Sequence, residues 1–321
     1  MSDALGAVPL PPYEIVANVS EGRDPAILAV FTAVVAGSPG VRLLDLHHDA
    51  DHDRSVFTYV AAGGVELVAA TLALARIAVA SIDLSSPAKS GEGRGVHPRI
   101  GALDVVPVVP ISPEATLEQA AEIARVAGAA LATTLRLPVH LYGAAARNDE
   151  RRSLPTLRRG GFEQLTAHQA SEGGAPDFGP REPHPTAGAT AVGARTLMAA
   201  WNIALAGADA ETLLQVAKEI ASEIRGATPG GVRGLQALGF PLASKEIAQV
   251  SMNLHDLLEA TDRGDTLHAI RERIRAAASG RGVQIGETEV VGLLPDRALH
   301  AGGDPAALQI SGGWERVVLD R

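Results

Sequence analysis

Residues 55–82, SVFTYVAAGGVELVAATLALARIAVASI, decide the fold class of this chain. Their first part, residues 55–62, is rich in β-branched and aromatic side chains, and such residues favour a strand. Gly63 and Gly64 then turn the chain, and the long apolar stretch 65–82 predicts a helix. A strand that passes directly into a helix is typical of proteins that mix α and β structure.

The neighbouring sequence extends this unit in both directions. We expect earlier strands at residues 13–18 and 41–46, separated by a helix at 26–35 that Asp24 caps and Pro25 begins. A further strand is expected at 103–110, which completes the split β-α-β-β-α-β order. A helix at about 114–135 and a strand at 139–142 lengthen the unit.

The second part of the chain repeats that order of elements. Strands are expected at 197–205, 232–240, 247–254 and 287–294, and helices at 209–224 and 266–278. The sequence therefore predicts an α/β (α+β) protein with two similar, ferredoxin-like subdomains, at residues 1–182 and 183–305, followed by a tail at 306–321. Residues 144–188 are polar and rich in Gly, Pro and Arg, so we interpret them as the connection between the subdomains.

The composition is that of a globular protein. Apolar residues make up 46% of the 321 residues and charged residues 20%, which excludes a disordered chain. The formal net charge of −9 argues against a general nucleic-acid-binding protein, which needs a basic face. The chain has no cysteine, so disulfides, thiol nucleophiles and cysteine-bound zinc are excluded.

No stretch is expected to cross a membrane or to direct secretion. The most apolar segment, residues 65–82, is interrupted by Glu66 and Arg76. The first residues have no basic region followed by an apolar core, so we expect no signal peptide and a cytoplasmic protein.

The loop SGEGRGVHPRIGALD, residues 90–104, is the first candidate site. Its glycines allow the backbone to approach a ligand closely, and His97 stands just before a predicted strand. A histidine there can act as a general acid or base near neutral pH, and Arg94 and Arg99 beside it can hold carboxylates. The alternative is an ordinary solvated loop, and composition alone does not decide between the two.

Three other segments carry a functional and a plainer interpretation. The run HHDADHD at 47–53 contains possible metal ligands, but a polar loop between strands is the preferred interpretation and we expect no metal. Residues 18–23 after the first strand form either a binding loop or a turn that caps a helix. The glycines of residues 188–195 suggest a phosphate cradle, yet no Lys-Ser/Thr follows them, so this is not a Walker loop.

Several motifs, in order along nearly the whole chain, together resemble the formiminotransferase family. They are NVSEGR from Asn18, DRSVFT from Asp53, HPRIGALDV from His97, LYGAAAR from Leu141, PDFGP from Pro176, GATAVGAR from Gly188, AWNIAL from Ala200 and KEIAQVSMNL from Lys245. The HPRIGALD element is the most specific of them.

The resemblance implies a reaction and an architecture. Members transfer a formimino group from N-formimino-L-glutamate to N5 of tetrahydrofolate, a step of histidine degradation, without a metal. The family has two α/β subdomains with the folate in a cleft between them, and it is commonly a homodimer. The sequence after Leu294 is too short for the cyclodeaminase domain of bifunctional members, so we expect that activity to be absent.

The resemblance also implies roles for individual residues. His97 matches the catalytic acid/base, and the segment from Gly179 through Pro180 to Gly188 matches the folate-contacting segment. Asn18 and Asn202 are candidates for orienting polar substrate atoms, and Asp104 for positioning a basic group or the pterin edge. The candidates for holding substrate carboxylates lie in matched motifs: Arg23, Arg54, Arg99, Arg195 and Lys245.

Three alternatives stay open at this stage. A related folate-dependent transferase would use another N-formimino or N-formyl donor. A folate-binding protein without turnover would have no need of His97. A metal-dependent hydrolase would use the loop at 47–53.

Overall fold

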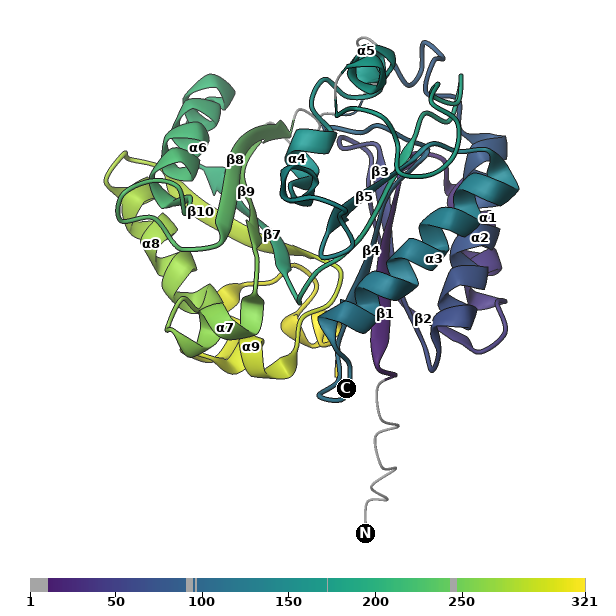
Figure 1. Cartoon of the computed structure of the whole chain (residues 1–321). Coiled ribbons are helices and arrows are strands. Elements are labelled where there is room, and N and C mark those ends of the chain that lie inside the picture. Colours follow the sequence, from purple (N-terminus) through teal and green to yellow (C-terminus); the bar gives the residue numbers. More distant parts are fainter. Residues whose placement is uncertain (1–10, 91–94, 96, 172, 243–246, 321) are drawn as a thin grey trace. The chain divides into compact units, whose positions relative to one another are not determined.

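The computed structural model describes residues 11–90, 95, 97–171, 173–242 and 247–320 (Figure 1). The chain divides into two compact units, and we call the one that ends at Arg195 the first unit and the one that starts at Thr196 the second unit. The predicted boundary between residues 182 and 183 lies earlier than this division.

The first unit is built on a six-stranded sheet of order β2-β3-β1-β4-β6-β5. Strands β2, β3, β1 and β4 are antiparallel neighbours, which is the predicted split β-α-β-β-α-β arrangement, and β6 and β5 then continue the sheet parallel to β4. Its main elements are β1 (Tyr13–Val19), α1 (Pro25–Ala36), β2 (Val41–Asp49), β3 (Arg54–Ala61), α2 (Gly64–Ser81), β4 (Leu103–Pro110), α3 (Leu117–Leu135), β5 (Val139–Gly143) and β6 (Thr190–Ala194).

Helices α1, α2 and α3 cover one face of this sheet (Figure 1). The Asp24 side chain accepts hydrogen bonds from the first turn of α1, and Thr116 and Gln119 form a reciprocal capping box at the start of α3, so local sequence fixes both helix starts. Helix α2 has the length and apolar composition of a membrane-spanning helix. Its buried side, which includes Leu67 and Leu74, packs in the core of the first unit.

Residues 144–188 do not form a connection between the units, which corrects the sequence-based interpretation. They fold within the first unit as η2 (Asp149–Arg152), α4 (Leu154–Leu157), η3 (Phe162–Gln164) and α5 (Leu165–Ala170). Leu157 and Leu165 pack against Tyr142 on the sheet face that α1–α3 leave free. The next residues, predicted as a possible phosphate cradle, are the buried strand β6 between β4 and β5.

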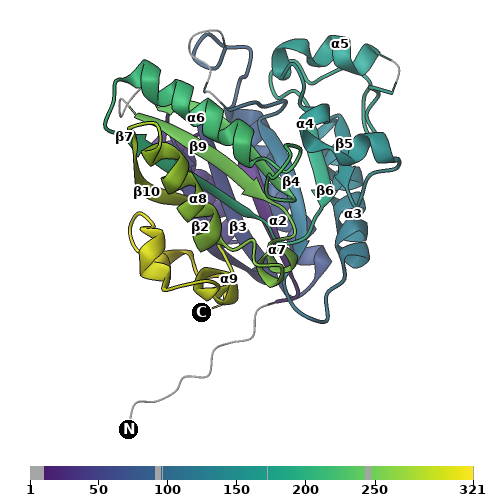
Figure 2. The same ribbon diagram turned by 90° about the vertical axis from the view of Figure 1, so that its left-hand side faces the viewer.

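The second unit repeats the split topology with a four-stranded antiparallel sheet of order β10-β7-β9-β8, as predicted. Helices α6 and α8 cover one face of it (Figure 2). Residues of the predicted tail, such as Leu308 and Val317, are buried in the core of this unit. The elements are β7 (Ala199–Ala206), α6 (Ala210–Ile224), β8 (Leu235–Leu242), β9 (Ile247–Leu254), α7 (Leu257–Asp262), α8 (Leu267–Ser279), β10 (Gln284–Val291), α9 (Asp296–His300), η5 (Pro305–Leu308) and η6 (Trp314–Val317).

Strand direction brings distant motifs of the first unit together. Because β1 runs antiparallel to both β3 and β4, the end of β1 lies beside the beginnings of those two strands. Asn18 pairs with Val56 of β3 and with Val105 of β4. The sequences that follow β1 and that precede β3 and β4 therefore meet at one edge of the sheet.

Candidate active site

Arg54 is the centre of a cluster at that edge. Its Nε and Nη2 donate to Asn18 Oδ1 at 3.0 and 2.7 Å, and its Nη1 donates to Asp104 Oδ2 at 2.9 Å. The same Nη1 lies 3.2 Å from His97 Nδ1. Burial lowers the pKa of Arg54 to about 10, although Asp104 raises it, so the guanidinium stays charged at neutral pH. The structure thus brings together four residues that the sequence singled out from separate motifs.

Asp104 holds this cluster together from inside the protein. Its side chain is fully buried, Oδ1 accepts the Ile100 N–H at 2.7 Å, and Oδ2 accepts a second guanidinium, Arg158 Nη1, at 3.0 Å. Burial raises the pKa of this carboxyl, but Arg158 and Arg54 outweigh burial and hold it below the usual value. Asp104 is therefore an anion at neutral pH.

His97 is half-buried, and its Nδ1 atom has two polar neighbours. Nδ1 lies 2.8 Å from the Pro98 carbonyl oxygen. A carbonyl oxygen only accepts, whereas the Arg54 guanidinium at 3.2 Å only donates, so these two contacts favour opposite tautomers of the ring. We assign the hydrogen to Nδ1 because the Pro98 contact is the shorter of the two, and this assignment leaves the lone pair on Nε2. Burial and then the charges of Arg54 and Arg158 hold the pKa of His97 well below its usual range. The imidazole is therefore neutral at neutral pH and has the lone pair that a general base needs.

A second set of ionic contacts supports the loop that carries His97. Lys89 Nζ donates to Asp53 at 2.6 and 2.9 Å and to Glu21 at 2.8 Å. A Cβ at Gly95 would collide with the His52 carbonyl, so only glycine lets the loop pack against that turn. Arg23, predicted as a carboxylate binder, donates from Nε to the Ala50 carbonyl at 2.9 Å and is part of this support.

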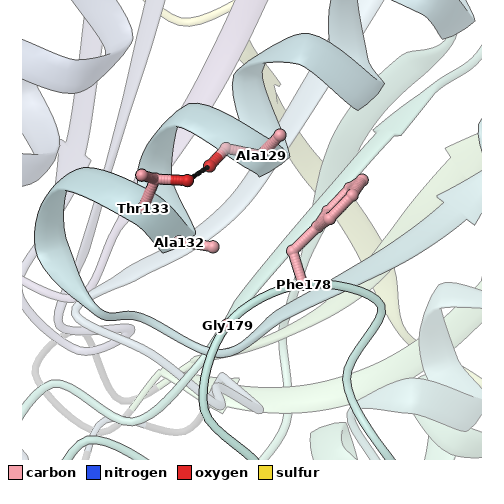
Figure 3. Close-up of a pocket in the computed structure, with 5 residues that line it drawn as sticks. All are labelled: Ala129, Ala132, Thr133, Phe178 and Gly179. Atoms are coloured by element: carbon pink, nitrogen blue, oxygen red, sulfur yellow. Dashed lines mark hydrogen bonds between the residues drawn. The ribbon is translucent and has the colours of Figure 1, made fainter.

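The glycines predicted to contact folate have different neighbours in the first unit. Gly188 pairs with Gly101 at the start of β6, directly beside the His97 loop. Gly179 lies beside Phe178 against the end of α3, where both line a depression with Ala129, Ala132 and Thr133 (Figure 3). Pro180 follows Gly179 in the chain. Gly188 is thus placed next to the charged cluster.

Arg195 belongs to a second charged group on the first unit's sheet. Glu14 of β1 is buried, and burial raises its pKa to about 7 although the Arg195 charge lowers it. Arg195 also acts electrostatically on the buried Tyr142 hydroxyl. Glu14 and Asn18 point to the same face of β1, and four residues of strand separate them by about 13 Å. The two charged groups therefore lie at opposite ends of one strand face.

The remaining predicted site residues either make contacts outside the Arg54 cluster or lie outside the residues that the structure describes. Asn202 in β7 of the second unit donates to Glu289 at 2.8 Å. Lys245 lies outside the described residues, as does Arg94. Arg99 is buried, 3% exposed, and its carbonyl accepts the Phe162 N–H.

The segment at 47–53 is partly strand rather than loop. His47, His48 and Asp49 belong to β2, and in the described part of the chain no group of three His, Asp or Glu side chains is arranged to hold a metal ion. Asp53 instead faces inward to Lys89.

Sequence reasoning missed two residues of the two charged groups. Arg158 lies in residues 144–188, which were interpreted as a connection, and Glu14 sits in a strand where it resembled an ordinary polar position. The only available signals were an arginine-rich run and a charged residue in an otherwise apolar strand. Neither signal reveals a partner far away in the sequence.

The sequence of this chain is similar to those of known proteins along most of its length. Residues 13–195 match the family model "Formiminotransferase domain, N-terminal subdomain", and residues 200–305 match "Formiminotransferase domain". Glutamate formimidoyltransferase of Streptococcus pyogenes serotype M1 is 37% identical over 89% of this chain and 90% of that protein. The enzyme of the same name from Thermoplasma acidophilum is 36% identical over 96% of both chains. Formimidoyltransferase-cyclodeaminase of Gallus gallus is 37% identical, and the match covers 50% of that longer protein.

Proposed function

Because this chain belongs to the formiminotransferase family, we propose that it is a glutamate formimidoyltransferase. It transfers the formimino group from N-formimino-L-glutamate to N5 of tetrahydrofolate and releases L-glutamate. Similarity to two stand-alone enzymes of that name over nearly their full lengths supports this proposal. Tetrahydrofolate is thus a co-substrate, and both substrates are small molecules.

The reaction needs one proton to move between two nitrogens. N5 of tetrahydrofolate attacks the formimino carbon, a new C–N bond forms, and N5 loses its proton. The tetrahedral intermediate then collapses when the bond from that carbon to the glutamate nitrogen breaks. The leaving nitrogen gains a proton and departs as the amine of L-glutamate. One group that accepts and then returns a proton serves both steps.

The contact between His97 Nδ1 and the Pro98 carbonyl is the observation that carries this mechanism. The His97 Nδ1–H is bound to the Pro98 carbonyl at 2.8 Å, so Nε2 is the nitrogen that accepts the N5 proton and later donates it to the leaving amine. The imidazolium formed between these steps lies near Asp104, whose negative charge partly offsets the two guanidiniums. Catalysis by such a positioned base contributes roughly 10²–10⁴-fold to the rate.

The other roles assigned to residues extend this proposal. Asn18 and Arg54 orient the reacting groups near His97, and Gly188 leaves room for the substrate beside the loop. Gly179 and Pro180 contact the folate farther from the reacting atoms. Arg23, Arg99, Arg195, Asn202 and Lys245 remain candidates for the more distant substrate groups. No metal takes part, and the active form is a homodimer in the cytoplasm.

A donor panel tests the proposed function. Purified protein is incubated with tetrahydrofolate and, in separate reactions, N-formimino-L-glutamate, N-formimino-L-aspartate, N-formiminoglycine and N-formyl-L-glutamate, and the 5-substituted folate is followed. We expect N-formimino-L-glutamate to give the highest kcat/KM and EDTA to leave it unchanged. A higher kcat/KM with another donor identifies the alternative transferase, and turnover lost in EDTA and restored by Zn²⁺ contradicts the metal-free mechanism. Light scattering of the same sample measures the oligomeric state.

A further inference from the structure

Arg158 reaches the His97 cluster from a segment with no assigned role. It follows α4 directly, and its side chain is 14% exposed. Nη1 donates to Asp104 Oδ2 at 3.0 Å and to the Pro98 carbonyl at 3.3 Å. The Pro98 carbonyl also accepts from His97, so Arg158 and the histidine ring are bound to the same oxygen.

The positive charges around Asp104 exceed what this carboxylate neutralises. Arg54 and Arg158 share Asp104 Oδ2, while Oδ1 is occupied by a backbone N–H, so one anion serves two cations. A charge removed from water is costly unless it is paired. The three nitrogens of Arg54 all donate to Asn18 or Asp104, whereas the buried Nε of Arg158 has no hydrogen-bond partner among the described residues. Of the two guanidiniums, Arg158 is therefore the one with an unfilled hydrogen-bond donor.

We propose that Arg158 binds the α-carboxylate of the formimino donor beside His97, an inference that rests on the proposed function. The nitrogen that His97 protonates is bonded to the α-carbon of glutamate, and the α-carboxylate is attached to that same carbon. A cation that shares a carbonyl oxygen with the His97 ring is thus placed for the α-carboxylate rather than for the γ-carboxylate. The planar guanidinium matches a carboxylate with two parallel N–H donors.

Arg158 also affects the titration of His97, and the test must separate this effect from binding. The groups that act on the ring are Arg54 from β3, His52 from the preceding turn, Arg158, and the Pro98 carbonyl. Removing Arg158 removes one positive charge, so we expect the acid limb of kcat/KM to move to higher pH. Donor affinity is therefore compared well above that limb.

The experiment compares two donors on four proteins. N-formimino-L-glutamate carries both carboxylates, and N-formimino-L-isoglutamine carries an amide in place of the α-carboxylate. The proteins are the wild type, Arg158→Gln, Arg158→Lys and the control Arg159→Ala, which alters the exposed neighbouring arginine. Glutamine retains a donor toward Asp104, and thermal unfolding verifies that each variant is folded.

We expect Arg158→Gln to raise the KM for N-formimino-L-glutamate about 10- to 100-fold, because the variant loses a charge-assisted hydrogen-bonded pair with the α-carboxylate. The KM for tetrahydrofolate and for the isoglutamine donor changes less than threefold, Arg158→Lys recovers part of the loss, and Arg159→Ala matches the wild type. Inhibition by L-glutamate weakens in parallel in Arg158→Gln, which reports binding without turnover.

Other outcomes overturn the inference. An equal loss with both donors in Arg158→Gln means that Arg158 only supports the loop. An unchanged KM for N-formimino-L-glutamate and an unchanged inhibition by L-glutamate mean that the α-carboxylate binds elsewhere. Failure of the proposed function is seen separately, because the wild type itself then transfers nothing from N-formimino-L-glutamate.

Discussion

The two units share one topology but differ in the chemistry of their sheets. In the first unit the antiparallel order β2-β3-β1-β4 is extended by two parallel strands, and its edge gathers a histidine, two arginines and an aspartate. In the second unit the order β10-β7-β9-β8 stands alone, and Asn202 with Glu289 is its polar pair between neighbouring strands. The same strand order therefore does not imply the same site, because loops and inserted segments supply the reacting groups.

The largest expected effect is that of His97→Ala in the first unit. If His97 transfers the proton, kcat falls roughly 10²–10⁴-fold while folate affinity stays within a few-fold. Protonation of a base whose pKa lies below the usual range slows the wild type only at acidic pH, and this limb disappears in the variant. Steady-state kinetics across pH measures both effects.

The control for this variant is His48→Ala, which removes an exposed histidine on β2. It retains the wild-type kcat if the effect belongs to the cluster. If His97→Ala retained near wild-type kcat at saturating substrates, His97 would not be the group that transfers the proton. The first unit would then not supply the catalytic base that distinguishes it from the second unit.

The next effect concerns stability and the buried Glu14 at the other end of the first sheet. Its folded-state pKa of about 7 lies above the ordinary 4.5, so its stabilising contribution is complete below pH 4.5 and is lost as pH rises toward 7. Over this window the wild type loses up to about 3 kcal/mol of unfolding free energy from this group. Glu14→Gln removes that dependence, and urea unfolding at several pH values measures it.

Glu122→Gln, which changes an exposed carboxyl on α3, is the matched control and keeps the wild-type pH dependence. A Glu14→Gln curve that follows the wild type over the same pH range would mean that Glu14 ionises normally. The charge of Arg195 would then outweigh the effect of burial on Glu14.

The smallest expected effect is that of Asn202→Ala in the second unit. The variant loses one hydrogen bond to Glu289, and a single neutral side-chain contact to a substrate corresponds to a change of roughly 2- to 10-fold in KM. Steady-state kinetics with each substrate varied in turn measures this change, with kcat close to the wild type. A fall in kcat comparable to that of His97→Ala would show that the second unit carries catalytic groups of equal weight.

Local sequence was sufficient for most of the helices and strands. The Asp24–Pro25 helix start, the strand before Gly63 and the two split patterns were predicted because capping and side-chain periodicity act within a few residues. His97 was predicted from its motif, and the structure adds the burial and the neighbouring charges of Arg54 and Arg158 that lower its pKa. Strand β6 was missed because its small residues, TAVGA, resemble a glycine-rich loop until β4 and β5 flank it.

The sequence by itself determined the order of elements, the family resemblance and the residues that the motifs carry. Only the tertiary structure decided that Arg54 and Arg158 share the Asp104 carboxylate, and that burial raises the pKa of Glu14. The physical reason is that the two kinds of interaction act between different sets of neighbours. Propensity and capping depend on neighbours along the chain, whereas ion pairing and desolvation depend on neighbours in space, here 50 and 54 residues apart for the two arginines and Asp104.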